Sequence, residues 1–168
     1  MSLIDYTYMQ NTPCVIPVFA PTSADGLGQI AYIDSLIERK QPETLKDVFG
    51  TELYDLFITG LAQTTPDTRW TTLKARILNT STKVSLLNYF VMVEHLNNNR
   101  SLSGEIGEFT VQAANMQRAD DKNKSRFLWN IGCDMVNDLY DWMQTVTDYP
   151  EADFTGMKYF EKINSFNI

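Results

Sequence analysis

The sequence predicts a mainly α-helical protein, a single-domain bundle of five or six helices with an extended N-terminal arm and a β-hairpin-like insert before the last long helix. Apolar residues recur every three or four positions through most of residues 25–147, as they do in helices that bury one face. Three prolines interrupt residues 1–24, and a polar, glycine-containing segment separates the last two helical patterns. These three observations divide the chain into an arm (1–24), a helical domain (25–147) with an insert (98–119), and an irregular tail (148–168).

The length and charge of the chain limit the possible functions. A chain of 168 residues is long enough for one domain with a hydrophobic core. The net charge is −7 and no Lys/Arg cluster occurs, so we do not expect the protein to bind nucleic acid through its phosphates. No apolar run is long enough to span a bilayer and the first residues do not resemble a signal peptide, so we expect no membrane association.

The two cysteines, Cys14 and Cys133, are far apart in the sequence and lack the spacing of a metal or redox motif. Disulfides are rare in proteins that remain in a reducing compartment. We therefore predict two reduced thiols in a protein made in a cytoplasm.

The N-terminal arm is predicted to follow an extended or polyproline path, because Pro13, Pro17 and Pro21 recur at intervals of four residues. The arm is too apolar for a free tail, so either the body of the protein or a neighbouring subunit is expected to hold it. The candidate residues for contact with a neighbouring subunit are Tyr6, Tyr8, Val15 and Phe19.

The helices are predicted from apolar spacing and from residues that begin or end helices. Helices are expected over residues 25–40, 42–49, 51–62 and 66–77, with an inward-facing stripe that includes Leu27 in the first. Pro42 suits a first helical position, Gly50 suits a C-terminal cap, and Thr51 and Thr65 suit N-terminal caps.

The later helices differ from each other in pattern. Residues 82–97 are apolar nearly all round, which is typical of a central helix wrapped by others. Residues from about 120 to 147 carry a continuous apolar seam and predict the last long helix. The aromatic tail is expected to pack as a short turn or strand.

Candidate catalytic residues are few. His95 is the only histidine, and its place near the end of an apolar helix favours a hydrogen-bonded structural residue. Asp134, Asp138 and Asp141 recur at helical spacing and form one acidic stripe. No matching His or carboxylate helix accompanies them, so the stripe indicates a solvated, lumen-facing or partner-facing surface rather than a metal site. We predict no enzyme activity and no cofactor.

The insert contains "GEIGEFTVQAA", which alternates like a β-hairpin arm or an edge strand. One interpretation is a hairpin folded over its own helices. The other is strand addition to a neighbouring subunit, in which backbone hydrogen bonds bind and alternate side chains select. The candidate interface residues are Ile106, Glu108, Phe109 and Val111.

Several of these residues resemble, in their order, a family of prophage proteins from gut bacteria. The matching positions are Ile37, Glu38, Leu45, Gly50, Glu52, Leu53, Tyr54, Phe57, Gly60, Leu61, Trp70, Leu73, the "GEIGE" of the insert, Asn115, Lys124 and Asn130. The terminal "NSFNI" is similar to the Asn-Ser-Phe-Gly-Ile of the family, from which Asn167 departs. The resemblance covers the chain from about residue 30 to the end, with the N-terminal arm outside it.

Such proteins look like the head–tail connectors, or adaptors, of tailed bacteriophages. The resemblance implies a homo-oligomeric ring, typically of twelve copies, that contacts the portal protein and tail or further neck proteins while DNA passes without specific binding. It implies a structural protein of the virion neck, made in the host cytoplasm, with Gly50 as a cap and Tyr54, Phe57 and Trp70 in the core. Alternatives are a tail-completion or head-closure ring and, from a different class, an enzyme or small-molecule-binding protein with a deep pocket.

Overall fold

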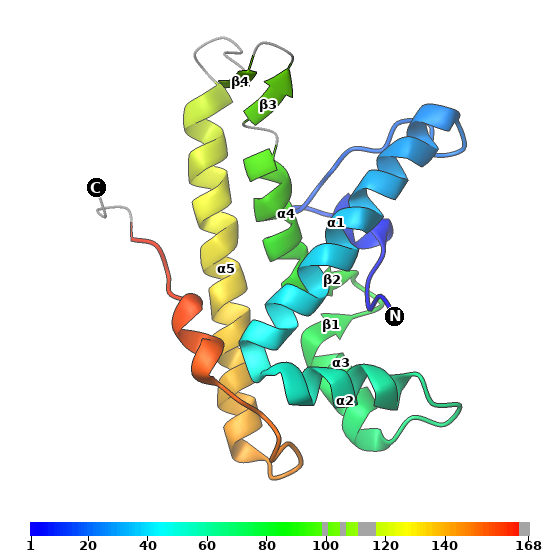
Figure 1. Ribbon diagram of the computed structural model, residues 1–168, viewed down its shortest axis with the longest axis vertical. Coiled ribbons are helices and arrows are strands. Elements are labelled where there is room, and N and C mark those ends of the chain that lie inside the picture. The colour runs from blue at the N-terminus through cyan, green and yellow to red at the C-terminus, as the bar shows by residue number, and fades with distance from the viewer. Residues whose placement is uncertain (99–100, 105–106, 111–116, 165–168) are drawn as a thin grey trace.

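The computed structural model describes residues 1–98, 101–104, 107–110 and 117–164. Within these residues it contains five α-helices and two small antiparallel hairpins, one of them before the last long helix (Figure 1). The predicted mainly α fold with a hairpin-like insert is therefore confirmed. The elements are η1 (Tyr6–Gln10), α1 (Ala24–Phe49), α2 (Thr51–Leu61), α3 (Thr68–Ile77), β1 (Leu78–Asn79), β2 (Val84–Ser85), α4 (Leu86–Asn98), β3 (Ser101–Gly104), β4 (Gly107–Thr110), α5 (Gln117–Thr145) and η2 (Thr155–Tyr159).

Helix α1 is one continuous helix, although two were predicted from the position of Pro42. Proline inside a helix removes one backbone hydrogen bond and crowds the preceding turn. The buried face of α1 nevertheless continues across this position, with Ile37 on one side and Leu45 and Val48 on the other. Burial of both halves against the same core holds the helix together through the proline.

Gly50 separates α1 from α2, as its predicted role as a cap requires. Its φ of +88° lies in the region that favours glycine, and its N–H donates to the carbonyl of Lys46 at 2.9 Å. A Cβ at this position would also lie 2.8 Å from Cβ of Asp153. Helix α2 begins at Thr51, so Gly50 rather than the predicted Thr51 is the N-cap residue.

A short hairpin replaces the beginning of the predicted central helix. Strands β1 and β2 pair antiparallel, and Asn79 Oδ1 accepts hydrogen bonds from the backbone N–H groups of Ser81 and Thr82 at 3.0 Å. Lys83 has a φ of +54°, which a helix does not permit. The central helix α4 therefore begins at Leu86 and packs between α1 and α5 (Figure 1).

The part of the core between the end of α1, α2 and α3 is aromatic. Phe57 on α2 is fully buried, and its ring centre lies 6.2 Å from those of Phe49 and Trp70. A Cβ on Gly60 would lie 2.1 Å from Nε1 of Trp70, so glycine permits α2 and α3 to approach closely. Phe57 and Trp70 are thus core residues, and Tyr54 is partly buried against the same core.

The N-terminal arm was predicted to be extended along its length. It instead contains the 3-10 helix η1 and folds onto its own subunit. Its apolar side chains Leu3, Met9 and Ile16 are buried in the core. The buried amide of Gln41 on α1 accepts from the N–H of Leu3 at 2.6 Å and donates to the carbonyl of Met1 at 3.0 Å. The body of the protein therefore holds the arm.

The C-terminal tail, for which a short turn or strand was expected, runs back along the helices and contains the short 3-10 helix η2 (Figure 1). Tyr149 donates from its hydroxyl to the carbonyl of Arg69 at 2.9 Å, and the N–H of Asp153 donates to the carbonyl of Phe49 at 3.0 Å. Phe160 is buried against α4 and α5. Among the helices described, none is long and apolar enough to cross a membrane.

Candidate functional site

The four candidate interface residues of the arm have different environments. Tyr8 is only 3% exposed and its carbonyl accepts from Nδ2 of Asn88 at 3.0 Å, so the prediction that its side chain contacts a neighbouring subunit is wrong. Tyr6 and Val15 are half-buried. Phe19 is 71% exposed and remains a candidate. The apolar content of the arm therefore serves mainly its own core.

The candidate residues of the insert are only partly described. Ile106 and Val111 lie outside the described residues. Glu108 and Phe109 lie in β4, opposite Ser103 and Leu102 of β3, and only the backbone of this hairpin is described. The hairpin pairs its two strands with each other, and the addition of a strand to a neighbouring subunit stays a prediction.

The outer face of α5 carries the predicted acidic stripe. Asp134, Asp138 and Asp141 are all exposed, and Asp134 forms an ion pair with Lys162 of the tail. Phe127 lies on the same face, because residues seven apart on a helix differ in direction by about 20°. Its side chain is 58% exposed. The sequence pattern missed Phe127, since it adjoins the seam residue Leu128 and looks like part of the core.

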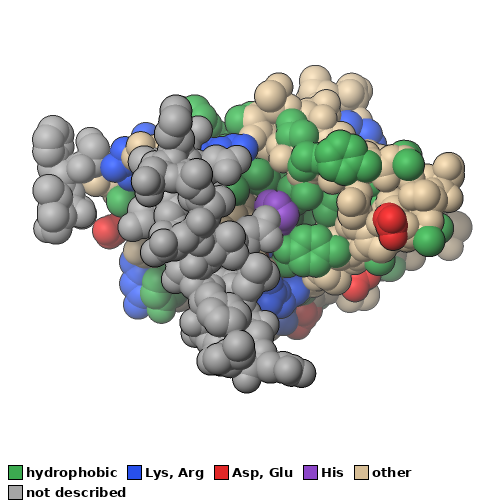
Figure 2. Space-filling view, turned by 90° about the horizontal axis from the view of Figure 1, so that it is seen from above, with side chains coloured by type: hydrophobic (Ala, Val, Ile, Leu, Met, Phe, Trp, Pro, Cys, Tyr) green, Lys and Arg blue, Asp and Glu red, His purple; other side chains and the backbone are tan. Residues whose placement is uncertain are grey.

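A second exposed apolar surface lies at the N-terminal end of α1. Leu27, expected to face inward, is exposed, as are Phe19 and Tyr32. This end of α1 projects beyond the helices that cover its later turns, and among the residues described its neighbours are the arm, whose Phe19 N–H donates to Gln29 at 2.9 Å, and His95 of α4 beside Tyr32 (Figure 1). Figure 2 shows hydrophobic side chains gathered on this face around the single histidine. We call Phe19, Leu27 and Tyr32 the α1 tip.

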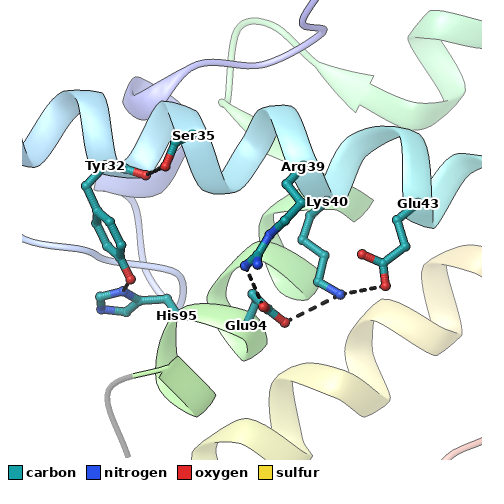
Figure 3. A network of polar contacts seen from close by, with 7 residues as sticks. All are labelled: Tyr32, Ser35, Arg39, Lys40, Glu43, Glu94 and His95. Atoms are coloured by element: carbon teal, nitrogen blue, oxygen red, sulfur yellow. Dashed lines mark hydrogen bonds and ion pairs between the residues drawn. The ribbon is translucent and has the colours of Figure 1, made fainter. Parts of the chain in front are cut away.

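A network of polar contacts joins α1 to α4 (Figure 3). Glu94 accepts from Arg39 at 2.6 Å and forms an ion pair with Lys40 at 3.4 Å, while Lys40 also contacts Glu43 at 2.9 Å. About two turns of α1 earlier, the hydroxyl of Tyr32 lies 3.3 Å from Nδ1 of His95. The network fixes α1 on α4 over three turns.

His95 has the features of the structural residue that was predicted. Its imidazole is half-buried and in contact with Tyr32, at 5.9 Å between ring centres. Burial, together with the nearby charge of Lys124, lowers the pKa of His95 below its ordinary value. A neutral imidazole at this junction stabilises the packing of α1 on α4.

The two thiols are buried and free. Burial raises the pKa of Cys14 to about 12 and that of Cys133 to about 11. Both side chains therefore remain protonated at neutral pH and act as small apolar core residues.

A groove of about 170 Å³ opens between α1, α4, α5 and the residues of η2. Lys40, Glu43, Asp47 and Glu94 line it with charge, and Trp129 is among the aromatic residues that form the rest of its wall. Burial, followed by the negative charge of Glu43, raises the pKa of Asp47, whereas Lys40 acts in the opposite direction. Sequence reasoning missed this groove because its residues come from four separate segments.

A search for metal-binding groups and comparisons with known proteins do not indicate a function. Among the side chains described, no group of three or more His, Cys, Asp and Glu residues is arranged to hold a metal ion. No protein-family model, curated protein or solved structure matches the chain. The exposed surfaces and the groove are therefore the features on which a functional proposal has to rest.

Proposed function

We propose that the chain is a structural subunit of an oligomeric ring at the head–tail junction of a tailed bacteriophage, a connector beneath the portal through which DNA passes. The resemblance in residue order from Ile37 to the final "NSFNI" is what suggests this class of protein. The chain has no catalytic role in this proposal. Its place is the neck of the virion, after synthesis in the host cytoplasm.

The observation that carries the proposal is that exposed apolar side chains lie at two separate places, the α1 tip and Phe127 on the outer face of α5. A ring made from identical subunits uses head-to-tail contacts, so each subunit needs two different and complementary surfaces. The α1 tip supplies one, with Phe19 as its most exposed side chain, and the outer face of α5 supplies the other through Phe127. In a ring, the tip of one subunit packs on α5 of the next.

The acidic stripe supports the proposal that this part of α5 faces the DNA in the channel. Among the residues described, Asp138 and Asp141 are in no ion pair, and both are exposed. Like charge disfavours adhesion to phosphate, which lets DNA slide past a wall without binding to it. With Phe127 at a subunit contact, the later turns of α5, which carry Asp138 and Asp141, line the channel.

The experiment measures the mass of the assembled protein. We expect the purified chain, or the chain in its virion, to form a closed ring of about twelve copies rather than a 19.2-kDa monomer. Phe19→Ser and Phe127→Ser should each reduce the ring to monomers in light scattering and electron microscopy. Leu56→Ser is the matched control, since Leu56 is an exposed apolar residue of α2 away from both surfaces.

A second variant tests the insert. Deletion of Gly104–Ala113 should abolish the ring and leave the helical circular dichroism nearly unchanged. Loss of helical signal would mean that the insert belongs to the fold of the monomer. A wild-type chain that stays monomeric in solution and is missing from the neck of the particle would contradict the ring itself.

A further inference from the structure

The size of the groove between α1, α4 and α5 limits what it binds. Its volume of about 170 Å³ is well below the roughly 300–1,000 Å³ of sites for drug-sized ligands and cofactors. A protein cavity of about 150 Å³ holds one benzene molecule. The groove therefore suits a single flat group the size of one ring.

The charges of the groove favour a cation. Among the described residues that line it, Glu43, Asp47 and Glu94 contribute three carboxylates and Lys40 one ammonium group, and because Arg39 also pairs with Glu94, one negative charge is left in excess. Lys40 lies between Glu43 and Glu94, and Arg39 binds Glu94 from outside the groove (Figure 3). Among the residues described, the side chain of Asp47 has neither an ion pair nor a hydrogen bond. Asp47 is the carboxylate left for a ligand.

The aromatic wall favours a planar cation over a compact one. Phe90, Trp129 and Phe160 form one cluster, with the Phe90 ring centre 5.3 Å from each of the other two. Trp129 is held in place because its Nε1–H donates to the carbonyl of Glu161 at 2.9 Å. Tyr159, at the rim, already has the ammonium of Lys158 5.2 Å from its ring centre. Aromatic rings attract cations over their faces, and guanidinium also stacks on them.

We infer that the groove binds the guanidinium group of an arginine side chain from another polypeptide, with Asp47 and Glu43 as acceptors and Trp129 beside its plane. A guanidinium group presents several N–H donors in a fixed plane, which matches carboxylates above an aromatic wall. A polypeptide is the expected source because the groove of about 170 Å³ holds only the guanidinium group, so the rest of the ligand lies outside it against the protein surface. The inference does not depend on ring assembly and can fail without affecting it.

The test is a titration followed by NMR. The probe is N-acetyl-arginine methylamide, and the readouts are the backbone amide of Asp47 and the indole N–H of Trp129. We expect saturable shifts of both signals. The lysine analogue should bind at least about fivefold more weakly because it is not planar, and the uncharged citrulline analogue should produce no shift.

Two variants locate the site. Asp47→Asn should weaken binding of the arginine probe at least about tenfold, and Glu43→Gln should weaken it less, because Glu43 also contacts Lys40. Asp141→Asn is the control, an exposed acidic residue outside the groove that should leave binding unchanged. Circular dichroism of each variant verifies that it is folded.

Three outcomes would overturn the inference. Equal binding of the citrulline analogue would show that the positive charge of the ligand does not contribute to binding. Unchanged binding of the arginine probe by folded Asp47→Asn would show that the probe binds outside the groove. Tighter binding of free L-arginine than of the capped residue would assign the groove to a small metabolite instead of a polypeptide.

Discussion

The side-chain amide of Asn130 on α5 forms two hydrogen bonds with the backbone of Ile163. Its Nδ2 donates to the carbonyl at 3.1 Å and its Oδ1 accepts from the N–H at 2.8 Å. An amide that pairs with both backbone groups of one residue imitates a β-bridge. Together with the ion pair of Asp134 and Lys162, it attaches the tail to the outer part of α5.

We predict that Asn130→Ala loosens the tail without unfolding the protein. The side chain is at the surface, so the loss of two hydrogen bonds acts on local opening more than on global stability. Amide hydrogen exchange at Ile163 should accelerate at least about tenfold. Asn137→Ala, an exposed asparagine two turns later on α5, should leave this exchange rate unchanged. Equal rates in both variants would show that other contacts hold the tail.

Two phenylalanines should differ sharply in their effect on stability. Phe57→Ala removes a fully buried ring beside Phe49 and Trp70 and leaves a cavity, so we expect a loss of about 3–5 kcal/mol in the free energy of unfolding. Phe127→Ala removes an exposed ring and should change it by less than about 0.5 kcal/mol. Urea unfolding followed by circular dichroism measures both. A large loss for Phe127→Ala would show that its side chain serves the core.

The thiols are predicted to react slowly in the folded protein. At about pH 8, a pKa of about 11 in place of 9.0 reduces the thiolate of Cys133 about 100-fold, and a pKa of about 12 reduces that of Cys14 about 1,000-fold. Labelling with a thiol-disulfide reagent, quantified by mass spectrometry, should modify Cys133 before Cys14. Both should react at the rate of free cysteine in guanidinium chloride. Rapid labelling of the native chain would contradict the buried positions.

His95 should make the protein less stable in mild acid. Its folded pKa is lowered, so below about pH 6.5 the unfolded chain takes up a proton that the folded protein does not. The free energy of unfolding therefore falls as the pH decreases from about 6.5 toward the folded pKa. His95→Gln removes this contribution, because glutamine does not titrate.

Urea midpoints at about pH 7.5 and about pH 5.5 test the role of His95. The wild type should lose more stability between these two conditions than His95→Gln does. Raised carboxyl pKa values, as at Asp34 and Asp47, act with the opposite sign and are common to both proteins. An identical change in wild type and variant would remove His95 as the cause.

The sequence was informative where a local pattern determines the structure. Apolar spacing identified the helical regions, and Gly50 ends α1 because its backbone conformation suits glycine. Pro42 was misleading, since burial on both sides of it outweighs one missing hydrogen bond. The hairpin before α4 was missed because the side-chain cap of Asn79 and the positive φ of Lys83 leave little trace in hydropathy.

The candidate sites depended on long-range packing and were harder to predict. Tyr8 and Phe19 look equivalent in the sequence, yet the side chain of Tyr8 is 3% exposed and that of Phe19 is 71% exposed. Leu27 repeats the apolar spacing of α1 but lies on a part of the helix that extends past the core. The groove brings Asp47 and Trp129 together, and no pattern along the chain connects two residues so far apart.

The contact of Tyr149 with Arg69 also affects how the protein is made. The two residues are 80 positions apart, and at roughly 5–20 residues per second a ribosome needs about 4–16 s to synthesise the intervening chain. During that time the surfaces of α1 and α3 that the tail later covers remain accessible to chaperones and proteases. Closure of the bundle therefore has to wait until translation has passed Phe160, and premature termination upstream of Tyr149 should yield an aggregation-prone fragment.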